Sequence, residues 1–357
     1  MKILYLMHVD WGWIKQRPHF IAEYLAKNGY KVDVYYKPYS KKFYVENNTN
    51  LVTLKPIKQI KGQRFSIIKK INFWLYKNSV KRMVKNNSYD YVYITHPSMF
   101  VKDLRSKLIY DCMDDNAAFS MSDKKRNDIM QKEKDLIQQS EIVLFSSEYL
   151  SQTVIKRIGF TPKKIKIINN AINLPSSQIK KSCLEKKVQQ DSDEIILTYI
   201  GTISDWFDVE LLRNVQKEYS ERKIVFKLYG PVDSKSDFSG FNLMGSVKHE
   251  KIFEIMEESD VLIMPFVLND LIKSVNPVKL YEYIYSGKPV ITIEYGETLK
   301  FSDYVYLYKA SEFESFISCL NDIRNNQFKS KRSFEEAQEF VKNNTWENRV
   351  CQIIDML

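Results

Sequence analysis

A lysine and a glutamate stand three residues apart, Lys279 and Glu282, in the segment NPVKLYEYIYSGKPVITIE. We expect Asn276 to cap a helix there, Pro277 to occupy its first position and Gly287 to follow its end. The first turn of a helix already carries about half a positive charge, so a lysine is unfavourable there unless an anion binds. The ammonium and the unpaired backbone N–H groups would together hold a diphosphate.

Glu282 is expected on the same helix face as Lys279, about 4.5 Å further along the axis. A carboxylate at that distance suits bidentate hydrogen bonding to ribose hydroxyls. The alternative is a surface ion pair, worth on the order of a few tenths of a kcal/mol. Because ligands bind at the carboxyl ends of parallel strands, where this helix would begin, the nucleotide interpretation is favoured.

Three carboxylates, Asp111, Asp114 and Asp115, follow one another in the segment YDCMDD at the end of an apolar strand. Mutual repulsion and an apolar wall would raise the pKa of one of them, which could then serve as a general base. Asp115 also suits an Asx turn and the cap of the helix beyond Asn116.

Candidates for binding an acceptor lie in the loop HVDWGWIKQRPHF: Asp10, Trp11, Trp13, Arg17 and His19. The tryptophans offer flat apolar faces for sugar rings. Arg17 could reach an acceptor phosphate or be a solvated charge at a helix end. For His19 a packed or capping role is favoured over a catalytic one, and His8, which ends the first strand, has the same two interpretations.

Short apolar strands alternate with helical stretches along the chain, which predicts an α/β protein with parallel sheets. We expect two Rossmann-like, doubly wound domains that face each other across a cleft. Residues 1–170 would form the acceptor and membrane-facing domain, and 171–193, which are polar and aperiodic, a linker. Residues 194–332 would form the donor domain, and 333–357 a C-terminal helix that packs back across the junction.

Composition limits the classes of function. The 357 residues include 54 Lys and Arg against 44 Asp and Glu, and the net charge of +10 favours anionic partners. The four cysteines form no CxxC pair, which argues against a zinc knuckle or a disulfide framework and for a reducing compartment. No apolar run is long enough for a signal peptide or a membrane span. No GxGxxG follows either first strand, which disfavours a nicotinamide cofactor.

The Asp-x-Asp sequence at Asp191 and Asp193 has the form of a Mn²⁺ site, but it falls in the polar linker before a strand. Solvation of the linker explains it better, and the sequence predicts neither a metal nor a cofactor.

A basic, acid-free stretch runs from Asn47 through Tyr89. It contains ten Lys and Arg, as many as the net charge of the whole protein, within residues 55–86. Aliphatic and aromatic residues alternate with them, which is typical of a helix lying in an anionic membrane interface. The alternative is a core-facing helix with a solvated back. It contains no motif that reads nucleic acid, so nucleic acid is not an expected partner.

The segment that carries Lys279 resembles the donor-nucleotide motif of GT-B glycosyltransferases, particularly those of bacterial surface-polysaccharide assembly of the capsule or teichuronic-acid type. These carry a similar Asn-Pro-x-Lys-x-x-Glu-Tyr helix followed by Gly-Lys-Pro-Val. Other matches fall in the family's order and spacing: QRPHF, YDCMDD, IGTISDWFDVELL, LYGPV, DVLIMPF and the late helix with Trp346.

The resemblance implies a GT-B fold and a nucleotide-sugar donor, a UDP-sugar being favoured. It implies these donor-binding residues: Gly201, Thr202, Ser204, Tyr229, Gly230, Gly245, Val247, Asn276, Pro277, Val278, Lys279 and Glu282. The inverting glucuronosyltransferase of xanthan assembly shares this fold, and that analogy assigns the base to Asp114, with Asp115 as the alternative. Ser274 stands where the large retaining branch has an acidic residue, which favours inversion.

The expected activity is metal-independent transfer of a sugar to a lipid-linked or growing polysaccharide in the cytoplasm, at the inner face of the plasma membrane. Two alternatives remain open. One is an epimerase of the same fold acting on a UDP-sugar, and the other is a non-catalytic protein that binds anionic ligands or membranes.

Overall fold

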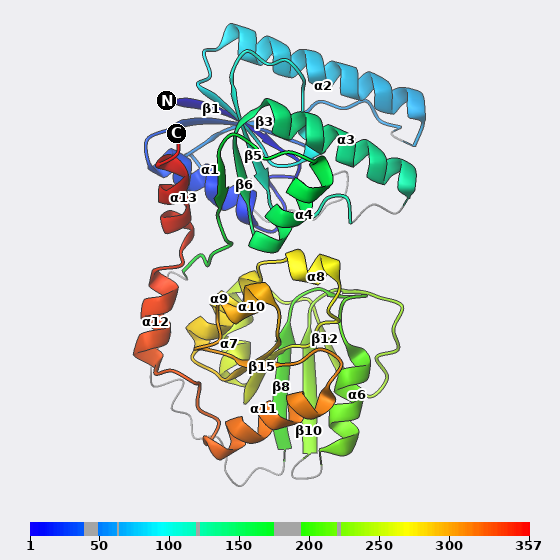
Figure 1. The fold of residues 1–357 in the computed structure, drawn as a ribbon, viewed down its shortest axis with the longest axis vertical. Coiled ribbons are helices and arrows are strands. Elements are labelled where there is room, and N and C mark those ends of the chain that lie inside the picture. Colours follow the sequence, from blue (N-terminus) through cyan, green and yellow to red (C-terminus); the bar gives the residue numbers. More distant parts are fainter. Residues whose placement is uncertain (39–48, 63, 119–121, 175–193, 220–222) are drawn as a thin grey trace. The chain divides into compact units, whose positions relative to one another are not determined.

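The computed structural model describes residues 1–38, 49–62, 64–118, 122–174, 194–219 and 223–357 (Figure 1). The chain forms two compact units. Unit 1 comprises Met1–Asn170 and Trp346–Leu357, and unit 2 comprises Ala171–Thr345. Most of the predicted linker, with its Asp-x-Asp sequence, lies outside the described residues.

Unit 1 is built on a parallel seven-stranded sheet in the order β3-β2-β1-β4-β5-β6-β7. Its strands are β1 (Lys2–Met7), β2 (Lys31–Tyr36), β3 (Thr53–Pro56), β4 (Tyr91–Ile94), β5 (Lys107–Cys112), β6 (Ser140–Phe145) and β7 (Ile165–Ile167). Its helices are α1 (Arg17–Lys27), α2 (Ser66–Asn86), η1 (Pro97–Met99), α3 (Asp123–Gln139), α4 (Glu148–Ile158) and α13 (Trp346–Ile354). The strand order reverses between β1 and β4, and such a switch point is where open α/β sheets bind ligands.

Unit 2 repeats this plan with a parallel six-stranded sheet in the order β12-β10-β8-β13-β14-β15 and a small pair, β11-β9. Its strands are β8 (Glu194–Ile200), β9 (Ile203–Ser204), β10 (Lys223–Tyr229), β11 (Val232–Asp233), β12 (Asn242–Gly245), β13 (Val261–Met264), β14 (Val290–Ile293) and β15 (Tyr306–Tyr308). Its helices are α6 (Val209–Glu218), η2 (His249–Lys251), α7 (Ile252–Glu257), α8 (Asp270–Ser274), α9 (Val278–Ser286), α10 (Gly296–Leu299), α11 (Phe313–Asn325) and α12 (Phe334–Lys342). The switch point lies between β8 and β13.

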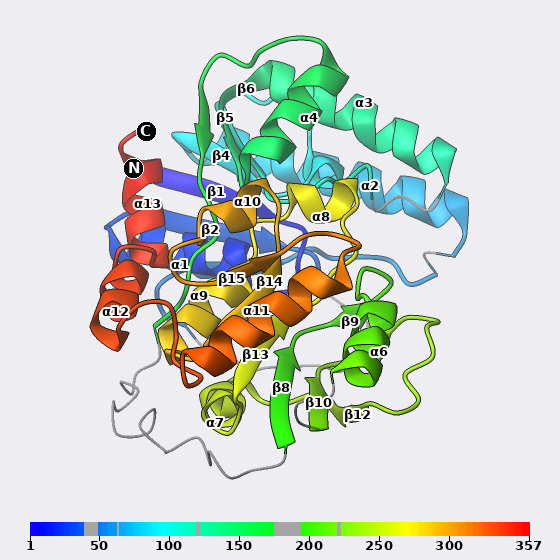
Figure 2. The same ribbon diagram turned by 60° about the horizontal axis from the view of Figure 1, so that its bottom comes forward.

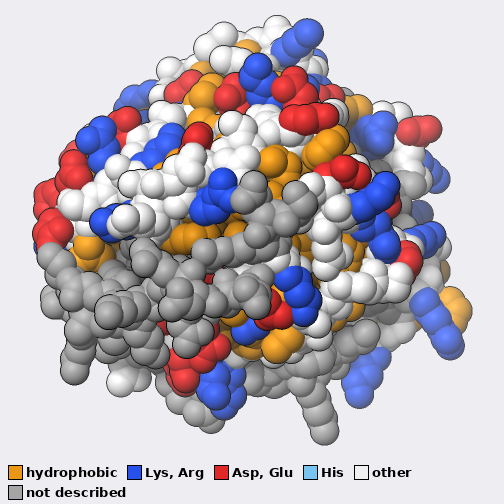
Figure 3. All heavy atoms as spheres, turned by 90° about the horizontal axis from the view of Figure 1, so that it is seen from below, with side chains coloured by type: hydrophobic (Ala, Val, Ile, Leu, Met, Phe, Trp, Pro, Cys, Tyr) orange, Lys and Arg blue, Asp and Glu red, His pale blue; other side chains and the backbone are white. Residues whose placement is uncertain are grey.

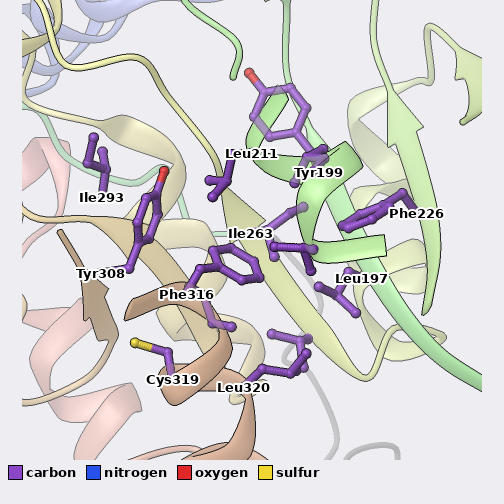
Figure 4. Close-up of a cluster of buried hydrophobic side chains, with 14 of the residues drawn as sticks. Leu197, Tyr199, Leu211, Phe226, Ile263, Ile293, Tyr308, Phe316, Cys319 and Leu320 are labelled. Atoms are coloured by element: carbon purple, nitrogen blue, oxygen red, sulfur yellow. The ribbon is translucent and has the colours of Figure 1, made fainter. Parts of the chain in front are cut away.

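Apolar strands buried on both faces require helices on both faces, and unit 2 has them. Figure 4 shows one of its cores, in which side chains of β8, α6, β13 and α11 point toward one another, among them Leu197, Leu211, Ile263 and Phe316. Residues of α7, α9 and α12 form a second core with other residues of the sheet. The prediction of two Rossmann-like, doubly wound domains is therefore confirmed.

The C-terminal segment is two helices rather than the single helix expected. α12 ends at Lys342, and Asn343 and Asn344 form a turn before α13, because asparagine favours helix ends over helix interiors. α12 packs against α9 in unit 2, whereas α13 packs beside α1 in unit 1 (Figures 1 and 2). The ring of Trp346, which is 1% exposed, stacks on Phe20 with centroids 5.4 Å apart.

None of the helices in the described part of the chain combines the length and the apolar run that a membrane span needs. On the face of the molecule that Figure 3 shows, the described Lys and Arg side chains are interspersed with Asp and Glu. The charge there is mixed in sign, unlike that of residues 55–86.

Candidate functional site

Helix α9 lies at the carboxyl edge of the sheet of unit 2 and begins one residue later than expected. Pro277 is its N-cap, and Gly287 ends it at φ 72° as predicted. Asn276 is not the cap, which corrects the sequence prediction. The Asn276 side chain is buried, donates to Glu297 Oε2 at 2.8 Å and accepts from the Tyr281 hydroxyl at 3.3 Å. Asn276 therefore fixes the turn that leads into α9.

Tyr283 anchors α9 to the end of strand β8. The backbone N–H of Ile200, the last residue of β8, donates to the Tyr283 hydroxyl at 2.8 Å. Lys279 stands four residues before Tyr283 and therefore shares its helix face. Tyr283 thus holds α9 to the end of β8, and Gly201 is the next residue of the chain.

Lys279 and Glu282 form an ion pair on the first turns of α9, with Nζ and Oε2 2.9 Å apart. The Glu282 side chain is 8% exposed and the Lys279 side chain 32% exposed. This contact is the ion pair that the alternative to nucleotide binding predicts. The buried position of the carboxylate distinguishes it from an ordinary solvated i,i+3 pair. Val278, at the start of the helix, is exposed.

Three glycines follow or end the neighbouring strands β8, β10 and β12: Gly201, Gly230 and Gly245. Gly201 N–H donates to Tyr229 O at 2.8 Å, and Gly230 N–H donates to Gly245 O at 2.8 Å. Gly230 has φ 141°, and a Cβ there would stand 1.8 Å from Gly201 O. This close backbone contact requires glycine at position 230.

The other residues predicted for the donor differ in their surroundings. Thr202 is exposed. Ser204 is buried, and its hydroxyl donates to Asp233 O at 2.9 Å, which holds β9 to β11. Tyr229 is buried in a core, and Val247 packs against the same core.

Arg17 in unit 1 is buried against Asp111 and does not present its charge to an acceptor, which corrects a second prediction. Its Nε and Nη2 donate to the Asp111 carboxylate at 2.8 to 3.1 Å. Its Nη1 donates to Ile168 O at 2.6 Å. A carboxylate that is 0% exposed needs such a partner, because an unpaired buried charge is strongly unfavourable.

The loop after β1 is held by its own polar groups. Asp10 is buried and accepts from Gly12 N–H at 2.9 Å, and Trp11, 3% exposed, packs on the His19 ring. His19 Nδ1 accepts from the backbone N–H of Gln16 at 3.2 Å, and burial lowers the pKa of His19 to about 4. Asp10, Trp11 and His19 build the loop, and His19 is packed and capping, which is one of its two expected interpretations. Trp13 is half-buried, whereas the other predicted acceptor residues of this loop are buried.

Asp115 and Asp114 have different environments at the carboxyl end of β5. Asp115 Oδ1 accepts from Ala117 N–H at 3.1 Å and from Arg157 Nη1 at 2.9 Å. It is therefore the turn residue of this segment, but it does not cap the next helix, because α3 begins at Asp123 and its N-cap is Ser122. Asp114 is half-buried, and its carboxylate has no hydrogen bond or ion pair with any residue in the described ranges. Burial raises the pKa of Asp114 to about 6; Arg17 opposes this rise, and Asp111 and Asp115 add to it.

His96 is a candidate that the sequence interpretation missed. It follows β4 by two residues, and its ring lies 4.8 Å from that of His8, which follows β1. The sequence did contain a signal for His96, because it is a polar residue just beyond an apolar strand. That strand, β4, pairs with the first strand, β1. In the ranges that the structure describes, no cluster of three or more His, Cys, Asp or Glu is arranged to hold a metal ion.

Residues 19–175 match the family described as Glycosyltransferase Family 4. The matched residues make up less than half of the chain. They include the carboxyl ends of β4 and β5, with His96, Asp114 and Asp115, whereas the loop residues Asp10 to Arg17 precede the match.

TuaH of Bacillus subtilis (strain 168), whose name assigns it to teichuronic acid biosynthesis as a glycosyltransferase, is similar to this chain. The two are 26% identical over 217 residues, which are 57% of this chain and 54% of TuaH. The chain thus spans about half the length of this curated relative. Together with the match to Glycosyltransferase Family 4, this similarity confirms the predicted resemblance to glycosyltransferases of surface-polysaccharide assembly.

Two solved structures are similar over almost the whole chain. Sucrose-phosphate synthase of Thermosynechococcus elongatus gives a TM-score of 0.72 at 12% identity, covering 100% of this chain and 98% of that chain. Anabaena Alr3699/HepE, in complex with UDP and glucose, gives 0.70 at 14% identity, covering 99% and 98%. At such identities the likeness concerns the fold alone, which is GT-B, as predicted.

Proposed function

We propose that the protein is a glycosyltransferase that moves a sugar from a UDP-sugar to a lipid-linked or growing surface polysaccharide. The observation that carries the proposal is the ion pair at the start of α9, in which the half-exposed Lys279 meets the buried Glu282. Glycines at the carboxyl ends of β8 and β10 add to it. The match to Glycosyltransferase Family 4 and the likeness to TuaH support the proposal. The UDP in the Alr3699/HepE structure supports the choice of nucleotide.

In this proposal, unit 2 binds the donor. The Lys279 ammonium and the N–H groups at the start of α9 stabilise the diphosphate as it departs, supplying the positive charge for which many transferases use a metal. Glu282 accepts hydrogen bonds from the ribose hydroxyls. The glycine edge at Gly201 and Gly230 lets the backbone approach the nucleotide closely.

Unit 1 binds the acceptor and supplies the base. Asp114 takes the proton of the acceptor hydroxyl, the oxygen attacks the anomeric carbon, and the bond from that carbon to the diphosphate breaks with inversion. The UDP leaves with the bonding electron pair. With a pKa of about 6, Asp114 is mostly ionised at neutral pH and remains a stronger base than an exposed aspartate.

Nucleotide binding tests the donor part without knowledge of the acceptor. We expect UDP to raise the melting temperature of the protein more than GDP, dTDP or CMP. Lys279→Ala should weaken UDP binding at least tenfold, because a charge-assisted contact worth about 1.5–3 kcal/mol is lost. The control is Lys273→Ala, which removes a half-exposed lysine that pairs with Asp270 three residues away on α8. Equal UDP affinity in the two variants would refute the proposed role of α9.

Turnover tests the acceptor part. Asp114→Asn should keep its UDP affinity and lose sugar transfer. Conversion of a UDP-sugar without any acceptor would instead identify an epimerase.

Helix α2 supports binding to a membrane surface at the cytoplasmic leaflet. Only three of its 21 residues, Asn72, Tyr76 and Val80, are buried, at a spacing of four that gives one narrow stripe toward unit 1. The core-facing alternative therefore accounts for few of its apolar residues. Exposed on the helix and just before it are Phe65 51%, Ile67 67%, Ile71 42%, Phe73 44% and Trp74 61%. Exposed Lys and Arg interleave with them, and each contributes about 1 kcal/mol near an anionic surface.

Vesicle sedimentation tests this membrane contact. The protein should sediment with phosphatidylglycerol vesicles at low salt and not with phosphatidylcholine vesicles. The double variant Ile67→Ser with Trp74→Ser should lose most of this binding. Leu299→Ser removes a similarly exposed apolar side chain from unit 2 and should not change it. Undiminished sedimentation of the double variant would refute the proposal.

A further inference from the structure

Two histidines lie at the switch point of unit 1, where strands β1 and β4 are neighbours. His8 directly follows β1, and His96 follows β4 by two residues. Their rings are tilted by 33° with centroids 4.8 Å apart, and both residues are half-buried. Neither Nε2 makes a hydrogen bond to another residue within the described ranges.

Thr95 contacts His8 through its hydroxyl. The Thr95 hydroxyl accepts from the backbone N–H of His8 at 3.2 Å, and it lies 3.2 Å from Leu6 O and 2.8 Å from His8 Nδ1. When its single hydrogen is donated to Leu6 O, the contact with His8 is made by Nδ1–H as the donor, and we assign His8 this tautomer. In the neutral ring, His8 Nε2 then carries a lone pair and can only accept.

His96 has the opposite arrangement. Its Nδ1 accepts from the backbone N–H of Ser98 at 2.9 Å and thereby caps the short helix η1. The ring proton must then be on Nε2, which can only donate.

Both rings are neutral at physiological pH. Burial lowers the pKa of His8 to about 3, and His96, Lys37 and His19 add to the effect. Burial also lowers the pKa of His96 to about 4, with further contributions from Lys37 and Lys132. The two rings therefore present one neutral acceptor and one neutral donor side by side.

One neutral donor beside one neutral acceptor suits a sugar better than a metal ion or a phosphate. A divalent metal would need lone pairs on both Nε2 atoms, and His96 Nε2 carries a proton. A phosphate is best held by cations, and neither ring is charged. Neighbouring hydroxyls of one sugar ring, in contrast, are both donors and acceptors and match the pair.

We propose that His8 and His96 form a subsite for a neutral sugar, in which one hydroxyl donates to His8 Nε2 and its neighbour accepts from His96 Nε2. The subsite rests on the proposed function, within which it would hold the acceptor sugar. β4 neighbours β5, so the subsite and Asp114 lie at the same edge of one sheet.

Nitrogen NMR of the full chain with ¹⁵N-labelled histidine tests the subsite, because the protein has only four histidines. At pH 7 we expect the proton of His8 on Nδ1 and that of His96 on Nε2. His8→Asn and His96→Asn assign the signals. Asparagine keeps a donor for Thr95 in the first variant and an acceptor for Ser98 in the second, so these structural contacts survive while Nε2 is removed.

The probes are the methyl glycosides of glucose, galactose, mannose and N-acetylglucosamine. At least one should shift the Nε2 signals of both His8 and His96, while His19, which is fully buried, serves as the unshifted reference. 2-Methoxytetrahydropyran has the same ring without its hydroxyls and should shift neither. Each asparagine variant should weaken binding of the active glycoside about five- to tenfold, as expected for one lost hydrogen bond.

Two results would overturn the subsite: the same tautomer in both rings, or no response of either Nε2 to any of the four glycosides. The same sample is then titrated with UDP. Binding of UDP without a sugar response refutes the subsite and leaves the proposed transferase intact. A sugar response without UDP binding supports the subsite and counts against the proposed donor.

Discussion

The substitution Asp114→Asn should make the protein more stable at pH 8, although it removes the proposed base. Burial raises the pKa of Asp114 from 3.8 to about 6, with Arg17 opposing the rise and Asp111 and Asp115 adding to it. At about 1.4 kcal/mol per pKa unit, this change corresponds to about 3 kcal/mol of unfavourable free energy in the folded, ionised state. Because Asp114 is only half-buried, solvent screening reduces the expected gain to about 1–2 kcal/mol.

The pH dependence of this gain follows from linkage. The folded protein binds the Asp114 proton more tightly than the unfolded chain, so ionisation of Asp114 costs stability. That cost is absent below about pH 4, grows up to about pH 6 and is constant above it. Asparagine does not ionise, so the variant should gain stability over the wild type across this range and be equal to it at pH 4.

Urea unfolding at pH 4, 6 and 8 measures the effect without a substrate. The matched control is Asp115→Asn, whose carboxylate accepts from Ala117 N–H and pairs with Arg157. That variant should lose stability at pH 8, because it leaves Arg157 with one fewer partner. An Asp114→Asn variant that is less stable than the wild type at pH 8, or one whose gain does not change with pH, would show that the pKa of Asp114 is not raised.

Two further substitutions test the packing that positions the candidate sites. Gly230→Ala should destabilise the protein by at least about 3 kcal/mol, because its Cβ would stand 1.8 Å from a backbone oxygen. Gly240→Ala, at φ 90° in open space, should cost only about 1 kcal/mol. Thermal unfolding of both glycine variants measures the difference. Arg17→Met should cost about 3–5 kcal/mol in urea unfolding, since it leaves the buried Asp111 unpaired. Arg126→Met, which removes a half-exposed arginine, should change stability by less than about 0.5 kcal/mol, and equal effects of the two substitutions would contradict the role given to Arg17.

The central strands of both units could be predicted from the sequence, and the edge strands largely could not. β1, β8 and β14 are apolar runs because both faces of a central parallel strand are buried. β3 is the four-residue TLKP at the edge of the sheet, where a proline is tolerated, and it gives no apolar run. β15 is the three-residue YLY, in which both tyrosines are buried, but three residues are too few to stand out as an apolar run. Edge strands were therefore missed for two reasons: β3 has few buried residues, and β15 is short.

The candidate site was predictable where local chemistry decides it. The helix around Lys279 and its end at Gly287 follow from residue types alone. The surroundings of Arg17, His19 and Ser204 do not, because each is decided by a partner that the fold supplies. Arg17, for instance, meets Asp111 from 94 positions away. Residue type identifies a candidate group, and tertiary contacts decide whether it is already engaged.

The division of unit 1 between the two ends of the sequence affects its synthesis and its engineering. On the ribosome, Trp346 is translated after all of unit 2, so the face of α1 that includes Phe20 stays uncovered until late. A fragment that stops at Asn170 would leave the same face bare and would be prone to aggregate. The two crossing segments run in parallel, joined by a hydrogen bond from Ile172 N–H to Asn344 O. A gene that splices Asn170 directly to Trp346 should therefore yield unit 1 with its closing helix in place.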